Sequence, residues 1–390
     1  MNRRNFIQIL GLGAGLGAGI GISSAIVGCG PTEPTQAFGW NGPDPMEKDI
    51  RIQVLAYAIL SPNSHNIQPW IIRITGPLSF DLYVDPERLL PATDPYYRQI
   101  HISQGTFLET LSIAATGLSH EARIDYFPEG VYGNHELLNK PVASIQLIPR
   151  ADISPDPLFA HLLTRHSNKQ EYDNRRLKQT EIDALQTFHG AASIYPLSIV
   201  QSTKAKQQLE KILTKGMQIE VGDKKRDLET IGMFRFNDTE VKQYRDGFGV
   251  TQAGLSGIKK MIVENFLLSR ESTEKDPSAF GEQAVDLTRK TAESTATFAW
   301  ISSPGNSRLD QVKVGRNYCR INLKTTAMGL VQHPMSQVLQ EFDEMLPLQA
   351  EFKKQFAIKD SDTVQMLFRL GRAEATPHGP RRLITALIRD

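Results

Sequence analysis

The chain has 390 residues, of which 40% are hydrophobic and 22% are charged, the composition of an ordinary globular protein. Its length predicts two domain-sized units, or one unit built twice. The formal net charge of +1 at pH 7 gives no reason to expect a nucleic-acid partner. The nine histidines form no H-E-x-x-H motif and the two cysteines form no C-x-x-C pair, so no metal site is predicted.

The N-terminus differs in character from the rest of the chain. Arg3 and Arg4 precede a long uncharged run in which glycine alternates with other residues. A basic start, an apolar middle and a small-residue end predict a signal peptide, with a retained transmembrane anchor as the alternative. The arginine pair followed by Phe6 resembles the twin-arginine export signal, which carries folded proteins across a membrane.

The end of this run predicts a lipid anchor. Residues 26–29, Ile-Val-Gly-Cys, resemble a bacterial lipobox, in which the cysteine (here Cys29) is lipidated and becomes the new N-terminus. The other cysteine, Cys319, falls in a predicted core helix, so no disulfide framework is expected. We therefore predict a signal over 1–29, a Pro/Gly-rich tether over 30–45, and a lipid-anchored protein on the periplasmic or outer side of the cell envelope.

The body begins with a helix, two strands, a buried helix and two more strands. Helical spacing over 48–60 is followed by the strands "WIIRIT" and "FDLYV", the nearly all-apolar helix 101–118, and the strands "ARIDYF" and "ASIQLIP". The pattern pauses near residue 155 and then restarts with a helix at 179–188 and the strand "IYPLSIV". The helix 318–330 repeats the character of the helix 101–118, and "TVQMLFRLG" is a late strand.

This restart predicts an internal duplication with halves 46–155 and 156–390. Chance similarity between two amphipathic helices is the alternative. The second half carries an extra helical insertion at about 203–295, with patterns at 205–217, 257–270 and 282–293. The insertion either packs as a structural element or forms a lid over a site.

Two polar segments stand out as candidate ligand-binding residues. "SPNSHNIQPW", residues 61–70, combines proline, amides, a histidine and a tryptophan in one loop. In "RHSNK", residues 165–169, Arg165, Ser167 and Lys169 alternate and could converge on one anion, although a solvated basic turn is the alternative. A late basic pair, Arg381 and Arg382, would by itself be a surface feature.

Taken together, these motifs resemble the nitroreductase family of FMN-binding flavoproteins, and most closely its duplicated, Acg-type branch. The resemblance rests on "SPNSHNIQPW", "LPATDPYYRQIHISQG", "RHSNKQEYDNRRL", "GLVQHPMSQ" and the late basic pair, in that order, over about residues 48–200 and 295–390. It implies an α+β, nitroreductase-like α/β sandwich, duplicated so that one chain mimics the family dimer. Since only the first half has the amide loop and only the second has the phosphate motif, one FMN per chain is expected.

The resemblance also implies roles for individual residues. The phosphate would be held by Arg165, Ser167, Arg381 and Arg382, with His166 in place of the second arginine of the family motif. Lys169 would approach the N1/C2 carbonyl edge of the flavin ring and favour the negative charge of the reduced flavin. Pro62, Asn63, Ser64 and Asn66 would border the ring, with Gln68 and Trp70 beneath the loop. The segment Pro334, Met335, Ser336 and Gln337 would supply the environment of flavin N5.

The implied function is that of an exported, FMN-dependent oxidoreductase, monomeric, with ping-pong chemistry and a small-molecule acceptor. NAD(P)H is scarce outside the cytoplasm, so a membrane quinol or a protein partner is the expected donor. Two alternatives stay open: an FMN-binding or storage protein whose insertion covers the ring, and a flavin-free envelope scaffold.

Overall fold

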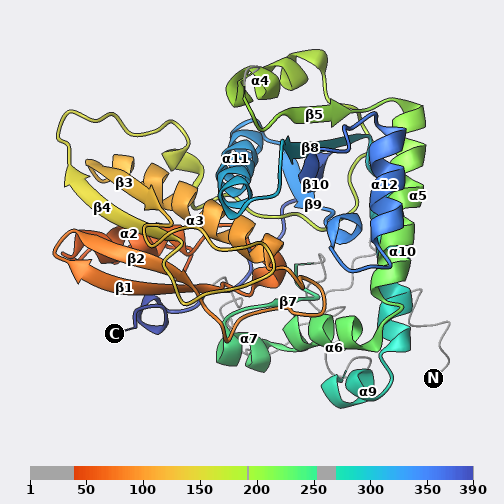
Figure 1. Cartoon of the computed structure of the whole chain (residues 1–390), viewed down its shortest axis with the longest axis horizontal. Coiled ribbons are helices and arrows are strands. Elements are labelled where there is room, and N and C mark those ends of the chain that lie inside the picture. The colour runs from red at the N-terminus through yellow and green to blue at the C-terminus, as the bar shows by residue number, and fades with distance from the viewer. Residues whose placement is uncertain (1–38, 191–192, 253–268, 390) are drawn as a thin grey trace, which may run out of the picture.

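The first half of the chain forms a four-stranded antiparallel sheet with one long helix packed against it (Figure 1). The computed structural model describes residues 39–190, 193–252 and 269–389. The strand order is β1-β2-β4-β3. The elements of this half are α2 (Ile50–Ala58), β1 (Trp70–Gly76), β2 (Ser79–Val84), α3 (Arg98–Gly117), β3 (His120–Tyr126) and β4 (Ala143–Pro149).

The second half repeats this arrangement. Its strand order is β5-β8-β10-β9, again antiparallel at every step, with the long helix between the second and third strands of the half. Its elements are α4 (Gln179–His189), β5 (Leu197–Val200), β8 (Thr297–Ser303), α11 (Arg308–Ala327), β9 (Val331–Pro334) and β10 (Thr363–Gly371). The prediction of an α+β fold containing an internal duplication is therefore confirmed.

The insertion lies between the first two strands of the second half, where the first half has only the two-residue turn 77–78. Within it, α5 packs against α10 and also against α12 (Leu346–Gln355), which follows the insertion (Figure 1). The predicted helix at 257–270 lies almost entirely outside the described residues. The described elements of the insertion are α5 (Thr203–Glu220), α6 (Lys224–Met233), β6 (Phe234–Arg235), α7 (Asp238–Tyr244), β7 (Phe248–Gly249), α9 (Arg270–Lys275) and α10 (Ser278–Glu293).

The two long helices join the halves. α3 and α11 cross where Gly105 faces Gly315, and each glycine is the eighth residue of a 20-residue helix. A Cβ atom on Gly105 would lie 2.0 Å from the Val312 carbonyl oxygen, and one on Gly315 would lie 2.0 Å from the Ile102 carbonyl oxygen. The absence of both side chains therefore lets the two backbones touch across the junction of the halves.

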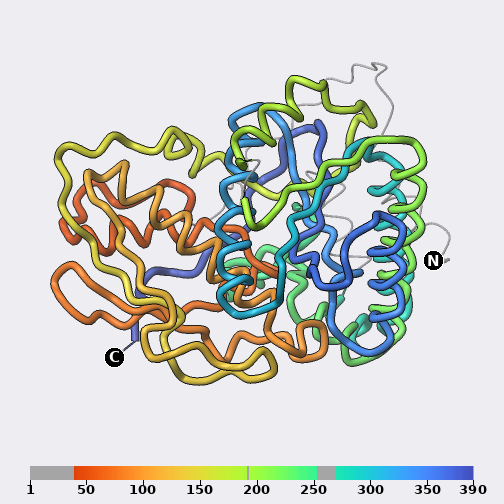
Figure 2. The backbone as a smooth tube through the Cα atoms, turned by 45° about the horizontal axis from the view of Figure 1, so that its top comes forward, coloured from red at the N-terminus to blue at the C-terminus, as the bar shows by residue number. Residues whose placement is uncertain are grey.

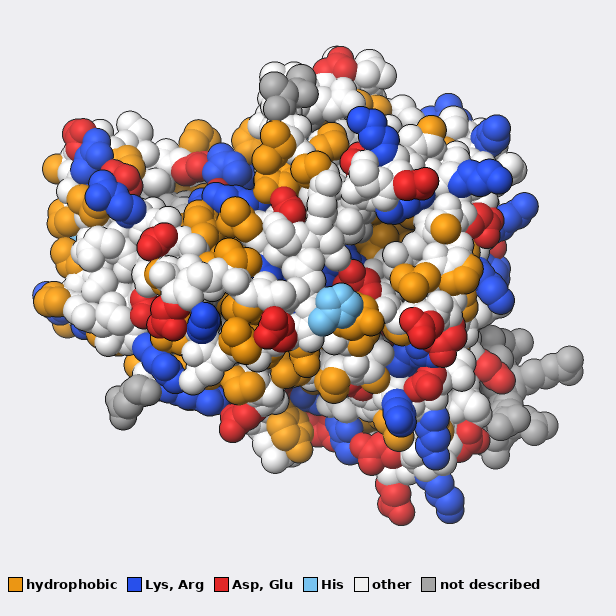
Figure 3. Space-filling model, in the orientation of Figure 1, with side chains coloured by type: hydrophobic (Ala, Val, Ile, Leu, Met, Phe, Trp, Pro, Cys, Tyr) orange, Lys and Arg blue, Asp and Glu red, His pale blue; other side chains and the backbone are white. Residues whose placement is uncertain are grey.

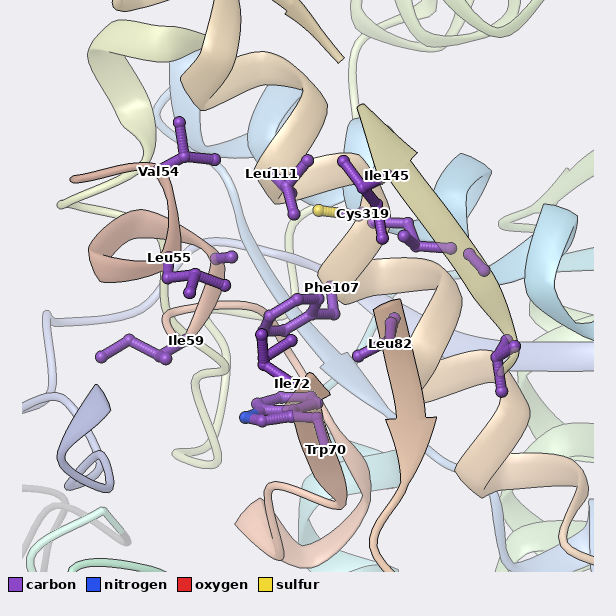
Figure 4. Packing of buried hydrophobic residues seen from close by; sticks show 14 of the residues in the cluster. Val54, Leu55, Ile59, Trp70, Ile72, Leu82, Phe107, Leu111, Ile145 and Cys319 are labelled. Atoms are coloured by element: carbon purple, nitrogen blue, oxygen red, sulfur yellow. The ribbon is translucent and has the colours of Figure 1, made fainter. Parts of the chain in front are cut away.

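The core of the first half continues into this junction. Trp70 of β1 is fully buried and packs against Phe107 of α3, with ring centroids 4.8 Å apart (Figure 4). Cys319 of α11 belongs to the same cluster, and Thr110 of α3 lies 3.3 Å from its sulfur. A hydrophobic surface shared between α3 and α11 thus fixes the two halves against each other.

The C-terminal segment crosses back from the second half to the first (Figure 2). After β10 it runs to the edge of the first sheet, where Ile388 bridges Ile72 of β1 in parallel. A short 3-10 helix, Ile384–Ala386, precedes this bridge. The crossing carries Arg381 and Arg382 to the loop at 61–70.

Several predicted element boundaries are wrong. α11 begins at Arg308, ten residues before the predicted start, because its first turns mix charged residues among the apolar ones. The strand β8 was not predicted, because its seven residues are all buried and a fully buried strand shows no alternation of apolar and polar residues. Before α4, the second half opens with the 3-10 turn Phe159–His161.

The predicted export signal Arg3 and Arg4, and the predicted lipidation site Cys29, lie outside the described residues. Of the predicted tether, residues 39–45 are described, and Trp40 among them is buried against the body. Within the described part of the chain, no helix is long and apolar enough to cross a membrane. Basic and acidic side chains are mixed over the face shown in Figure 3, in keeping with the near-neutral net charge.

Candidate functional site

The loop at 61–70 adopts an unusual backbone. His65, Asn66 and Gln68 all have left-handed φ angles, of 49°, 54° and 54°. Left-handed conformations in residues other than glycine cost free energy and are concentrated at functional sites. The side-chain amide of Asn63 holds the loop from within, since its oxygen accepts a 2.8 Å hydrogen bond from the Gln68 backbone N–H.

Helix α3 supports this loop from below. Ser103 accepts a hydrogen bond from the Ser64 N–H, and Thr106 donates to the Pro62 carbonyl oxygen. The buried amide of Gln104 donates 2.6 Å to the Pro69 carbonyl oxygen. These polar residues make the predicted apolar helix partly hydrophilic on its loop-facing side, and they fix the loop's position relative to α3.

Two arginines predicted to bind phosphate meet beneath the loop. Arg165 and Arg381, 216 positions apart in the sequence, both donate to the carbonyl oxygen of Leu60, at 3.0 and 3.3 Å. Arg165 also donates to Asn322, and Arg381 donates to the side-chain oxygen of Asn66 at 2.8 Å. The loop, the start of the second half and the C-terminal segment are thereby joined at one point.

Two histidines and a tryptophan complete this group. Trp40 stacks on His378 with ring centroids 3.9 Å apart, and the His166 and His378 centroids are 5.5 Å apart. The guanidinium carbons of Arg165 and Arg381 lie 5.6 and 4.9 Å from the Trp40 ring centre. Cation–π contacts of this kind contribute about 0.5–2 kcal/mol each. We call Arg165, His166, His378 and Arg381 the cation cluster.

The cation cluster contains no compensating acid. Among the described residues, no aspartate or glutamate forms an ion pair with any of its four members. Burial lowers the pKa of Arg165 and, together with the charge of Arg165, lowers the pKa of Arg381 well below its usual value. Like charges held together without a counterion favour the binding of an anion.

Three nitrogen atoms of the cation cluster are buried without a hydrogen-bond partner among the described residues: His166 Nε2, His378 Nε2 and Arg381 Nε. Buried polar atoms are nearly always paired, so unpaired ones need an explanation. An anion with several acceptor oxygens would satisfy all three atoms once the histidines are protonated. The arrangement is therefore chemically suited to a phosphate or sulfate group.

A second group of residues lies at the other end of the loop. The Lys169 Nζ is 3.9 Å from the ring centre of Phe248, and the His65 ring centre is 5.9 Å from that of Phe248. Burial lowers the pKa of Lys169 to about 8. Burial, followed by the charges of Arg369 and Lys169, lowers the pKa of His333 well below its usual value. We call His65, Lys169, Phe248 and His333 the lysine end of the site.

Other predicted site residues are placed differently. Arg382 points away from the cation cluster: it pairs with Asp85 at 3.4 Å and donates to the Gln68 carbonyl oxygen. Met335 is buried in the core of the second half, and its N–H donates to the Leu367 carbonyl oxygen. Pro334 ends β9, and Ser336 and Gln337 begin the turn that follows. Ser167 is half-buried between Arg165 and Lys169.

The insertion covers the loop. The Asn66 side chain donates to the Gly247 carbonyl oxygen at 2.9 Å, and the Asn66 backbone carbonyl accepts from the Gly247 N–H. The Gln68 side chain donates to the Arg245 carbonyl oxygen. Arg245 in turn donates to the Arg381 carbonyl oxygen. The Asn66 amide, expected to border a ring, and the Gln68 amide, expected beneath the loop, are thus bonded to residues 245–247, which lie over the loop as a cover.

Four residues of the site were not predicted from the sequence: Trp40, His378, Asn322 and Phe248. Trp40 lies in a segment predicted as a tether, although a lone tryptophan among Pro and Gly residues is itself a sign of packing. His378 stands three residues before Arg381, close enough to have been considered with the basic pair. Asn322 and Phe248 carry no sequence signal. In the described residues, no group of three or more His, Cys, Asp or Glu side chains could hold a metal ion.

Comparison with known proteins links part of the chain to nitroreductases. Over 76 residues it is 36% identical to "Putative NAD(P)H nitroreductase Rv3131" of Mycobacterium tuberculosis, and equally to its counterpart in a second strain. This match spans 20% of this chain and 22% of the relative, so the activity in that name enters only as a proposal. No family model matches the sequence.

Solved nitroreductase structures are similar only at a low level. A nitroreductase with bound FMN from Bacteroides fragilis is 12% identical with a TM-score of 0.33, covering 60% of this chain and 98% of that one. The FMN-dependent nitroreductase NfnB of Mycobacterium smegmatis, in complex with NADPH, is 13% identical with a TM-score of 0.34, covering 58% of this chain and 94% of that one.

The two unpaired histidines predict a pH-dependent anion affinity. Burial, followed by the charges of Arg165 and His166, lowers the pKa of His378 to about 4, and burial also lowers that of His166. An anion favours the charged imidazole and raises both pKa values, so binding takes up protons. Affinity for sulfate, whose charge does not change in this range, should therefore rise as pH falls from about 6.5 to about 4.

This pH dependence can be measured by calorimetric titration with sulfate at several pH values. The groups facing His378 are Trp40, Arg165, His166, Arg381 and the Thr164 carbonyl oxygen. The His378→Gln variant should show a flatter rise, because one of the two titrating groups is gone. A sulfate affinity that is the same at pH 7 and pH 5 would show that the histidines do not contact the anion.

Proposed function

We propose that this protein is an FMN-dependent oxidoreductase of the nitroreductase type that binds one FMN per chain. The observation that carries the proposal is the cation cluster, which has no acidic partner among the described residues and lies beneath an amide-rich loop, with the loop from the first half and the cations from the second. The 36% identity to a nitroreductase segment, and the duplicated sandwich, support the same reading.

The residues present fit the phosphate of FMN. Arg165, Arg381 and Ser167 would hold it, with His166 and His378 supplying the remaining donors through atoms that now lack partners. Lys169 would approach the carbonyl edge of the flavin ring, and Asn66 would border it. When bound, FMN supplies the redox chemistry, while the protein binds, orients and shields it from water.

The cover over the loop must move to admit the ring. Residues 245–249 occupy the space between the loop and Lys169, with Phe248 next to the lysine. In the proposal, this part of the insertion is a lid that opens for FMN and closes to exclude water.

The cellular setting of the proposal comes from the N-terminus. We propose export by the twin-arginine route through Arg3 and Arg4 and lipidation at Cys29, which would place the site next to the membrane. A quinol or a protein partner would then be the donor in place of NAD(P)H, with a small-molecule acceptor. Since one chain already contains both halves, we propose that it acts as a monomer.

A non-catalytic FMN-binding or storage protein is the second candidate function. Its support is the number of hydrogen bonds between the cover and the site: Asn66 to Gly247, Gln68 to Arg245, and Arg245 to Arg381. A cover held this firmly would exclude substrates as well as water.

One preparation tests both candidates. The mature chain, purified with FMN, should show a flavin spectrum with one FMN per chain. After reduction with dithionite, rapid reoxidation by a nitroarene or a quinone would support the oxidoreductase, and slow reoxidation by every small acceptor would support storage. A colourless protein that takes up no FMN would rule out both. Rapid turnover with NADPH and a nitroarene would contradict the proposed donor.

The loop asparagines give a direct test of ligand placement. The double substitution Asn63→Ala and Asn66→Ala removes the hydrogen bonds to Gln68, Arg381, Gly247 and Pro380, worth about 0.5–1.5 kcal/mol each. We expect FMN to bind at least about 30-fold more weakly, with the fold retained, as followed by flavin absorbance and circular dichroism.

Asn317→Ala serves as the matched control, because the side chain of this asparagine on α11 bonds, among the described residues, only the Lys313 carbonyl of its own helix. Its flavin content should equal that of the unmodified chain. Full flavin retention in the double variant would mean that the loop does not border the flavin.

A further inference from the structure

We propose that Trp40, on the segment that leads from the N-terminus into the body, is a positioning residue for the two anion-binding arginines. The proposal rests on the proposed function, since FMN is the ligand used to measure it. It follows that the segment carrying Trp40 must pack against the body of the protein for the cation cluster to take its binding geometry.

The first observation is the position of the indole ring. Trp40 is 8% exposed and lies against both Arg165 and Arg381, one from the start of the second half and one from the C-terminal segment. Guanidinium groups are attracted to the face of an indole ring. The neutral indole therefore contacts two positive charges, and no acidic residue in the described part of the chain forms an ion pair with either.

The second observation is that the ring is fixed on two further sides. Its Nε1–H donates 2.9 Å to the Gly379 carbonyl oxygen, which also accepts from Arg381. His378 stacks on the ring at 3.9 Å with an interplanar angle of 24°. These contacts fix the indole relative to the segment that carries Arg381, so the ring and the arginine keep a constant geometry.

The third observation concerns the backbone of the segment. Gly39 has a φ of +97°, and a Cβ atom at this position would lie 3.0 Å from Arg381 Cβ. Gly42, with a φ of +76°, packs against Tyr57 of α2. The segment therefore enters the site along a path that both glycines make possible. A mere spacer would not need these contacts.

The consequence for binding follows from electrostatics. Arg165 and Arg381 repel each other where they share the Leu60 carbonyl oxygen, and without the indole they would separate toward solvent. An anion would then have to bring the two arginines together again, at a cost to its affinity. A ligand without a phosphate group would be unaffected.

The test compares Trp40→Ala and Trp40→Phe in the full mature chain. Binding of FMN, riboflavin and inorganic phosphate is measured by titration, and the fold is checked by thermal unfolding. We expect Trp40→Ala to weaken FMN and phosphate binding by about 10-fold or more, and riboflavin binding by less than about 2-fold. Trp40→Phe keeps a ring face and should stay within about 3-fold of the unmodified chain.

The outcomes separate this inference from the proposed function. Equal FMN affinity in Trp40→Ala and the unmodified chain overturns the role of Trp40 and leaves the proposed function standing. An equal loss for FMN and riboflavin shows that Trp40 supports only the fold, and also overturns it. If the unmodified chain binds phosphate in a Trp40-dependent manner but binds no FMN, the proposed function fails and the role of Trp40 stands.

Discussion

Replacing Arg381 by glutamine is expected to weaken FMN binding by about 10- to 100-fold and to leave riboflavin binding unchanged. A hydrogen bond to a charged group contributes about 1.5–3 kcal/mol, and Arg381 is a fully desolvated cation with one N–H still unpaired. Arg165→Gln should have a similar effect. The double variant should lose measurable affinity for FMN, because no other arginine of the cluster remains.

The neighbouring Arg382 is a matched control for this prediction. It follows Arg381 directly and is equally buried, but its charge is paired with Asp85. Arg382→Gln should lower the free energy of unfolding, since it leaves a buried carboxylate less well paired. In Arg382→Gln, the ratio of FMN affinity to riboflavin affinity should equal that of the unmodified chain. If this ratio fell as far as it does in Arg381→Gln, the phosphate would not bind at the cation cluster.

Replacing Gly105 by alanine is expected to destabilise the protein by about 1–3 kcal/mol. The new methyl group would lie 2.0 Å from the Val312 carbonyl oxygen and 3.0 Å from the Gly315 Cα, and both contacts are backbone atoms that no side-chain rotation can relieve. The two long helices would have to separate. Gly315→Ala should behave in the same way, because it meets the Ile102 carbonyl at the same distance.

Urea-induced unfolding measures this effect, and Gly232→Ala provides the control. Gly232 is an exposed glycine of α6 with nothing within 4 Å of the added carbon, so alanine there should raise the free energy of unfolding by up to about 1 kcal/mol. Equal stability of the Gly105→Ala and Gly232→Ala variants would show that the helices are not in backbone contact. Since the site is shared between the halves, Gly105→Ala should also weaken FMN binding.

The ion-pair partners of the basic motifs were not predictable from the sequence. "RHSNK" and the late "RR" are equally basic in the printed sequence, yet Arg381 lies in the cation cluster and Arg382 pairs with an aspartate. Adjacent residues in an extended segment point to opposite sides, so one of the two had to face away. Which one faces the site depends on where the C-terminal segment meets the first sheet.

By itself the sequence determined most of the helices and strands, the position of the insertion and the loop at 61–70, because each of these leaves a local pattern of hydrophobic spacing or residue type. The α+β class and the duplication were implied by the resemblance of its motifs to a known family. Only the tertiary structure decided that Arg165 and Arg381 meet at the Leu60 carbonyl oxygen with the Trp40 ring against both, and that Gly105 faces Gly315. These contacts join residues far apart in the chain. Their partners are selected by packing between the halves, which no local pattern records.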